Sequence, residues 1–157
     1  LNRPLSALLA AGAVAMATMA FVVPKFMAIW TIPLLANAEA TGGTGAEMAA
    51  MLLPLLNVSI PFSLYTSFDY MGFWLYALFA VLTMRSLYAS DGLSRVIAVL
   101  VGLFGVGFHV ALACLLLGVI QAPDIEISFG VSFIPLLLLV LILPFAFWRD
   151  LKQARTI

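Results

Sequence analysis

Between Arg95 and Asp124 the sequence carries no charged residue. A helix needs about 20 consecutive apolar residues to cross the hydrocarbon core of a bilayer, and this stretch exceeds that length. The whole chain is 65% hydrophobic and 9% charged, whereas soluble domains carry about 25% charged residues. A soluble fold of this size cannot hide so much apolar surface. Continuous apolar runs, without the alternating pattern of a membrane β-barrel, predict an all-α polytopic membrane protein.

Four apolar runs predict a bundle of four transmembrane helices within a single domain that covers residues 1–157. The expected spans cover residues 6–29, 69–88, 95–120 and 129–148. The first run is too long for the apolar region of a signal peptide and continues past Lys25, so we expect a retained span. Because the numbering starts at Leu1 and not at a methionine, we expect a longer or processed product.

Residues 30–68 are expected to form an outer loop followed by a re-entrant or interfacial segment. Residues 36–47 are polar and rich in glycine, which predicts a loop. Residues 48–68 are uncharged and long enough to span, but Pro54 and Pro61 would leave backbone groups without partners in lipid. We therefore favour a short helix before Pro54, and a fifth span over 48–68 stays open.

Residues 93–120 are expected to form the central helix of the bundle. Small residues occupy two opposite faces of this helix at spacings of three and four. One face carries Ala98, Gly102 and Gly105, followed by His109, and the other carries Gly107, Ala111, Cys114 and Gly118. Small residues allow helix backbones to approach closely in lipid. We therefore expect both faces to pack against neighbouring helices.

His109 is the only histidine in the sequence and would lie near the middle of the bilayer, where ionisable groups are uncommon. Its imidazole has the chemistry to contact a cofactor such as haem, chlorophyll or a quinone, or to relay a proton. The alternative is a neutral histidine that bonds to a neighbouring helix. There is no second histidine for a bis-histidine haem, and Cys114 lies about 140° further around the helix. The pair therefore does not form a metal site.

Lys25 and Asp69 are the candidate functional charges. Lys25 lies near the end of the first span, where a lysine usually extends its ammonium to the interface. The alternative is a charge within a transport pathway. Asp69 is expected in the first turn of the second span, after a helix cap at Thr66 or Ser67.

The placement of charges predicts the orientation in the membrane. In the four-span arrangement, both chain ends and the expected turn at 89–94 share one side, and this side carries Arg3, Arg85, Arg95, Arg149, Lys152 and Arg155. The other side carries Lys25 at its border, together with Glu39, Glu47, Asp69, Asp124 and Glu126. Positively charged loops stay in the cytoplasm, which predicts cytoplasmic N- and C-termini. We expect the membrane to be a bacterial inner membrane.

Sequence motifs do not favour an enzyme. The chain has no HExxH, GxSxG or Walker pattern and no pair of carboxylates within the membrane. Zero net charge without a basic block argues against a nucleic-acid partner. The composition favours a non-catalytic membrane subunit or scaffold whose partners are the lipid bilayer and other membrane protein subunits. A cofactor-contacting subunit using His109, and a small transporter or channel component using Lys25 and Asp69, stay open as alternatives.

Residues 56–98 carry a recognisable order of features. An aspartate opens a helix, a tryptophan follows, and a short turn contains Gly-Leu-Ser and a basic residue; these are Asp69, Trp74, Gly92, Leu93, Ser94 and Arg95. This order resembles bacterial Yip1-domain proteins. The resemblance implies a non-enzymatic integral membrane protein with a membrane-organising or trafficking role. It also implies five spans and so supports the fifth-span alternative, although two full spans follow the similar segment here.

Overall fold

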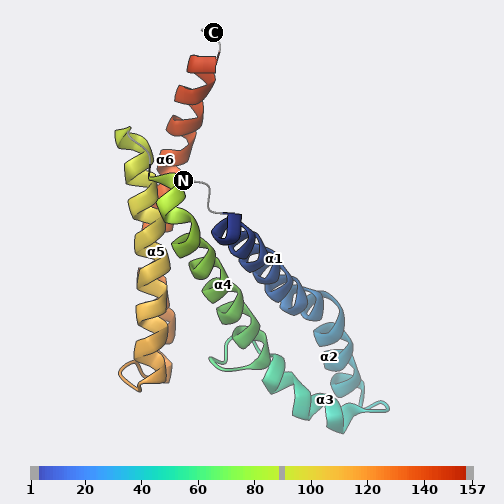
Figure 1. The fold of residues 1–157 in the computed structure, drawn as a ribbon. Coiled ribbons are helices and arrows are strands. Elements are labelled where there is room, and N and C mark those ends of the chain that lie inside the picture. Colours follow the sequence, from blue (N-terminus) through green and yellow to red (C-terminus); the bar gives the residue numbers. More distant parts are fainter. Residues whose placement is uncertain (1–3, 89–90, 155–157) are drawn as a thin grey trace. The chain divides into compact units, whose positions relative to one another are not determined.

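The computed structural model describes residues 4–88 and 91–154. Every regular element in these two ranges is helical (Figure 1). The α-helices are α1 (Pro4–Phe26), α2 (Ile32–Thr41), α3 (Ala46–Leu52), α4 (Leu64–Leu87), α5 (Gly92–Leu116) and α6 (Ile125–Ala154). Short helical turns cover η1 (Met27–Thr31), η2 (Leu53–Leu56) and η3 (Ala122–Asp124). The predictions for Arg3, Arg155 and residues 89–90 lie outside the described ranges.

Four helical segments of the described chain are long and apolar enough to cross a membrane. They cover Pro4–Thr41, Leu64–Leu87, Gly92–Leu116 and Ile125–Arg149, and a shorter apolar helix covers Ala46–Leu56. The predicted all-α class with four membrane spans and one shorter segment is confirmed. All four segments begin before their predicted starts, the first continues to Thr41 instead of ending at residue 29, and the third ends at Leu116 instead of residue 120. The protein is thus embedded in a membrane.

The first span opens a helical run of 38 residues that continues through η1 and α2. At 1.5 Å per residue this run measures about 57 Å, whereas the hydrocarbon core of a bilayer is about 30 Å thick. The run therefore extends well beyond the lipid core. η1 is a π turn that contains Ile29 and ends just before α2. Pro33 has no N–H to donate to the carbonyl of Ile29, which explains why the regular hydrogen-bond ladder is interrupted here.

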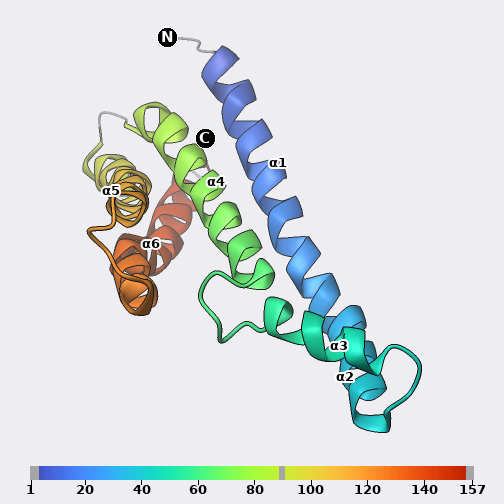
Figure 2. The same cartoon turned by 90° about the horizontal axis from the view of Figure 1, so that it is seen from below.

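The described chain divides into two compact units. One unit covers Val14–Leu75, and the other combines the residues up to Ala13 with those from Tyr76 onward. Within Val14–Leu75, α3 returns alongside α2 after a tight turn (Figure 2). Gly42 and Gly45 flank this turn with φ angles of +63° and +90°. Glycine adopts these left-handed angles without a Cβ clash, so the two glycines permit the reversal.

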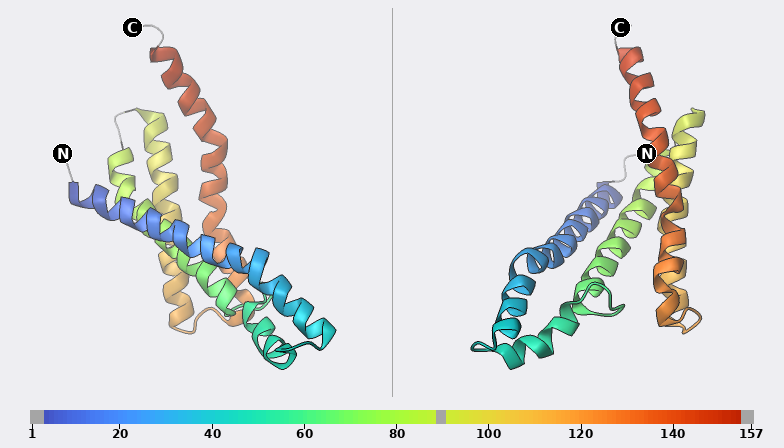
Figure 3. Two further views of the ribbon diagram at one scale, coloured as in Figure 1. Left: turned by 90° about the vertical axis from the view of Figure 1, so that its right-hand side faces the viewer. Right: turned by 180° about the vertical axis from the view of Figure 1, so that it is seen from behind.

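Within the other unit, α5 and α6 form an antiparallel pair (Figure 3). Aromatic rings fill the contact between the two helices: Phe104, Phe108, Phe129 and Phe133. Phe108 is fully buried, and its ring centroid lies 4.7 Å from that of Phe129. The apolar stripe of α5 is thus covered by α6 through ring packing.

Asp91 caps the N-terminus of α5 and ties it to the end of α6. Its Oδ2 accepts a hydrogen bond from the backbone N–H of Ser94 at 2.9 Å and lies 2.7 Å from Nη1 of Arg149. The Ser94 N–H and the Arg149 guanidinium both stabilise the carboxylate, and together they hold the pKa of Asp91 well below its usual range.

The loop predicted over residues 36–47 is mostly helix, which corrects that prediction. α2 continues to Thr41 because Ala36, Ala38 and Ala40 are strong helix formers. The helix ends only where Gly42 adopts the left-handed conformation of a C-cap. Polarity alone was thus a poor guide to where the helix ends.

The predicted cap of α4 is also wrong. α4 begins at Leu64, so Ser63 precedes its first residue, and Thr66 and Ser67 lie within its first turn. The Ser63 hydroxyl accepts a hydrogen bond from the backbone N–H of Thr66 at 3.1 Å, as an N-cap residue does. Asp69 therefore lies in the second turn of α4 and not in the first.

Residues 48–68 do not form one continuous helix, so the fifth-span alternative is not observed. The short helix expected before Pro54 is present as α3, and η2 extends it through Pro54 to Leu56. An irregular linker follows over residues 57–63. Phe62 in this linker has a φ of +71°, which is unusual for a bulky side chain.

Candidate functional site

Lys25 and Asp69, which are 44 positions apart in the sequence, form an ion pair between α1 and α4. Lys25 Nζ lies 3.2 Å from Asp69 Oδ2 and 3.3 Å from Oδ1. It also donates to the hydroxyl of Tyr65 at 3.1 Å and lies 4.8 Å from the centroid of the Tyr65 ring. One ammonium group thus joins a carboxylate and a tyrosine that lie one helical turn apart on α4.

A close approach of the two helices positions this cluster. The ring of Phe21, one turn before Lys25, meets that of Phe73 edge to face with centroids 4.9 Å apart. A Cβ added to Gly72 would lie only 2.7 to 2.9 Å from three ring atoms of Phe21. Gly72 therefore leaves the space that the Phe21 ring occupies, and this contact brings Lys25 level with Asp69.

The ion pair between Lys25 and Asp69 is partly exposed and links α1 to α4. The side chain of Lys25 is 56% exposed and that of Asp69 19% exposed. Within apolar surroundings, the pairing of the two charges reduces the free-energy cost that either charge would have alone. Within the described residues no group of three or more His, Cys, Asp or Glu side chains lies close enough together to hold a metal ion.

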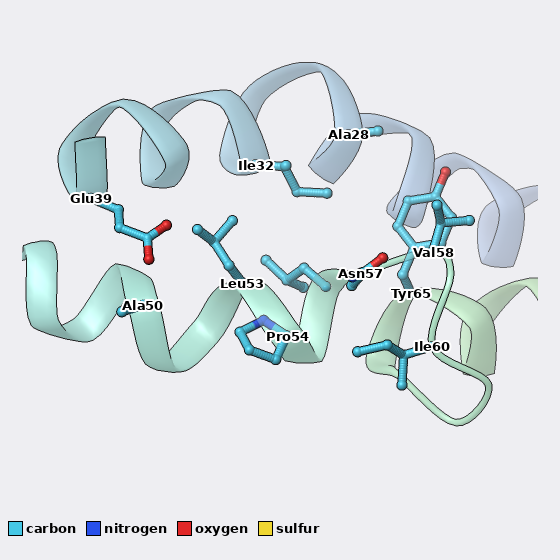
Figure 4. A pocket seen from close by; sticks show the side chains of 11 residues that line it. Ala28, Ile32, Glu39, Ala50, Leu53, Pro54, Asn57, Val58, Ile60 and Tyr65 are labelled. Atoms are coloured by element: carbon cyan, nitrogen blue, oxygen red, sulfur yellow. The ribbon is translucent and has the colours of Figure 1, made fainter.

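A pocket of about 540 Å³ lies beside the cluster, between α2 and the α3–η2 segment (Figure 4). Its walls are mainly apolar, and Ile32 and Leu53 lie in its middle. Glu39 lies at one end, while Asn57 and Tyr65 lie at the other. Tyr65 therefore belongs both to the wall of the pocket and to the ion-pair cluster.

His109 lies in α5 and is half-buried. Its Nδ1 is 2.7 Å from the carbonyl oxygen of Gly105, one turn earlier on the same helix. Nδ1 of His109 is therefore hydrogen-bonded to the backbone of α5 itself. A cofactor contact at His109 stays a prediction.

The first small-residue face of α5 lies against α4. Ala98 is buried, and Gly102 approaches Met84, whose Sδ would lie 3.0 Å from an added Cβ. An added Cβ at Gly105 would lie 2.9 Å from the carbonyl oxygen of Ala77 and 2.8 Å from Cγ2 of Val81. The two backbones approach so closely here that no side chain fits at Gly105 without movement.

The opposite face of α5 borders α6. A Cβ added to Gly107 would lie 3.9 Å from the Ser132 hydroxyl, which is an ordinary contact distance. Ala111 is buried and Cys114 is half-buried, and all these residues line one shallow groove beside α6. Gly118, predicted on this face, lies beyond the end of α5 in a turn with a φ of +73°. It permits the turn and is not part of the helical face.

Tyr65 and Glu39 were not predicted as site residues. Tyr65 precedes Asp69 by four positions, and this helical spacing is a usable signal for a shared face. Glu39 had no such signal, because the sequence predicted a loop at its position. Only the return of α3 alongside α2 places Glu39 at a pocket.

Comparisons with known proteins give no family assignment. No protein-family model matches the chain, and no match was found among the curated proteins or the solved structures. The resemblance of residues 56–98 to Yip1-domain proteins therefore stays a prediction.

Proposed function

We propose that the protein is a non-catalytic integral membrane subunit that packs against a helix of another membrane protein. The observation that carries this proposal is a face of small residues on α1 that is exposed in the isolated chain. It consists of Ala7, Ala11, Ala15 and Thr18, at spacings of four, four and three. We call it the open face of α1.

The open face is distinct from the face of α1 that packs within this chain. Ala10, Ala13, Ala17 and Ala20 are at most 3% exposed and recur at spacings of three and four. At 100° per residue, the mean directions of the two sets differ by about 135°. α1 therefore has one small-residue face that is buried within this chain and a second small-residue face that is exposed.

Lipid contact alone does not require small residues. α6 presents bulky side chains on its exposed surface, such as Leu137, Val140 and Leu141, each more than 60% exposed. Close helix packing in lipid, in contrast, favours Ala, Gly, Ser and Thr, because they let two backbones approach. The open face of α1 has the composition of a helix interface and differs from the lipid-facing surface of α6.

The same proposal includes an orientation with both chain ends in the cytoplasm of a bacterial cell. Four spans return the chain to the side on which it started. Arg85, Arg95, Arg149 and Lys152 flank the span ends on that side. The contact between Arg149 and Asp91 supports the common location of the start of α5 and the end of α6. An excess of Lys and Arg is typical of cytoplasmic loops.

Bulky substitutions on the open face test the subunit role. The native membrane is solubilised gently, and the complexes that contain this chain are separated by size and identified by mass spectrometry. We expect the parent chain in a complex larger than its own mass, and the double substitution Ala11→Leu and Ala15→Leu in a smaller particle.

Gly130→Leu is the matched control, because Gly130 is an exposed helical residue of α6 with open space around it. It adds bulk outside the open face and should leave the complex intact. A parent chain that migrates alone, or a complex that survives the double substitution unchanged, would refute the proposal.

A further inference from the structure

We propose that the pocket between α2 and the α3–η2 segment binds an elongated organic cation. The ammonium group of this molecule lies at Glu39, and its apolar body lies between Ile32 and Leu53. The inference does not depend on the subunit role, because the pocket is formed entirely by residues of Val14–Leu75.

The size and lining of the pocket fit a small organic molecule. Its volume of about 540 Å³ lies within the range of roughly 300 to 1,000 Å³ that is usual for ligand pockets. Most of its wall is aliphatic, which favours an apolar body. Its polar groups lie at the two ends and not in the middle (Figure 4), which favours an elongated molecule with a polar end.

The charges around the pocket select a cation. Glu39 is the only charged side chain among the lining residues. The ammonium of Lys25, which lies beyond Tyr65 at the other end, is already paired with Asp69. The pocket therefore presents one uncompensated negative charge, so an anionic ligand is repelled and a cationic ligand is attracted.

The position of Glu39 on its helix is a second reason to expect a cationic ligand. Glu39 lies in the last turn of α2, which ends at Thr41, and its own carbonyl accepts from the N–H of Gly42. A carboxylate at a helix C-terminus is destabilised by the helix dipole, which favours cations there. Within the described residues Glu39 has no basic partner. A bound ammonium group would remove this unfavourable interaction.

Titration calorimetry on the full chain in lipid nanodiscs tests the inference, with octyltrimethylammonium as the probe. Empty nanodiscs give the background of partition into lipid. We expect saturable binding of one cation per chain. Glu39→Gln should weaken it by at least about tenfold, equal to about 1.4 kcal/mol, and octanesulfonate, an anion with the same alkyl chain, should give only the background.

Glu47→Gln is the matched control, because Glu47 is an exposed carboxylate on α3 that does not line the pocket. It should leave the affinity unchanged, whereas Leu53→Trp should abolish binding by filling the pocket. The inference is overturned if Glu39→Gln and Glu47→Gln have equal effects, if octanesulfonate binds as tightly as the cation, or if no saturable binding occurs.

Discussion

Replacement of Gly105 by alanine should destabilise the contact between α5 and α4. The new Cβ would lie 2.8 Å from Val81 Cγ2, 2.9 Å from the carbonyl oxygen of Ala77 and 3.1 Å from the backbone nitrogen of Val81. Two of these three atoms belong to the backbone of α4 and cannot rotate away. The helices must therefore separate by several tenths of an ångström, and such overpacking costs about 1–3 kcal/mol.

Gly107→Ala is the matched control on the same helix. Its new Cβ would meet only the Ser132 hydroxyl at 3.9 Å, so no helix has to move. Both substitutions gain helix propensity, which is about 1 kcal/mol for alanine over glycine. This gain is common to the two variants and cancels in the comparison, so Gly105→Ala should be less stable than Gly107→Ala by about 1–3 kcal/mol.

Thermal unfolding of both variants in one detergent, followed by circular dichroism, measures this difference. For a chain of this length, 1 kcal/mol shifts the midpoint by roughly 2–4 °C. Gly107→Ala should unfold at or above the parent midpoint. Gly102→Ala should fall between the two variants, because the Met84 thioether that it meets is flexible. Equal midpoints for Gly105→Ala and Gly107→Ala would refute the argument that α4 and α5 are in backbone contact here.

Three further predictions concern packing and charge. Phe108→Ala should cost about 3–5 kcal/mol because the ring is fully buried, whereas Val110→Ala, at an exposed position, should change the unfolding free energy by less than about 0.5 kcal/mol. A double-mutant cycle with Lys25→Met and Asp69→Asn should give a coupling of about 0.2–1 kcal/mol that decreases in 1 M salt; a coupling that salt does not change would contradict a partly exposed pair. Because the pKa of Asp91 is lowered in the folded state, its stabilising effect should be complete above about pH 4 and be lost below it. The unfolding midpoints of the parent and of Asp91→Ala should therefore converge in acid. A constant difference between the two midpoints down to pH 2 would argue against the pairing.

The number of spans was predictable from the sequence because it depends on local properties. In lipid every backbone group must bond within its own segment, so a long apolar run without charge is sufficient to indicate a helix. The small residues at Gly102 and Gly105 were recognisable for a similar reason, since helical periodicity places them on one face. The end of α2 at Gly42 was equally local, but the polarity of the preceding residues concealed it.

The residue that caps α4 was not predictable from the local sequence. Ser63, Thr66 and Ser67 all have hydroxyl groups that can accept an N–H, and the sequence does not rank them. The linker before α4 distinguishes Ser63 from Thr66, because the Thr66 hydroxyl donates a hydrogen bond to the carbonyl of Ile60 in this linker at 3.1 Å. Thr66 itself lies within the first turn of the helix. Ser63 is left as the residue that caps the helix.

By itself the sequence determined the all-α class, the four spans and the residue types that can pack closely. Only the tertiary structure decided that Lys25 and Asp69 form one cluster with Tyr65, and that Glu39 lies at the end of a pocket. The physical reason is the range of the interactions. An apolar run or a helical face is specified by neighbours a few positions away, whereas a contact between residues 44 positions apart depends on how whole helices pack.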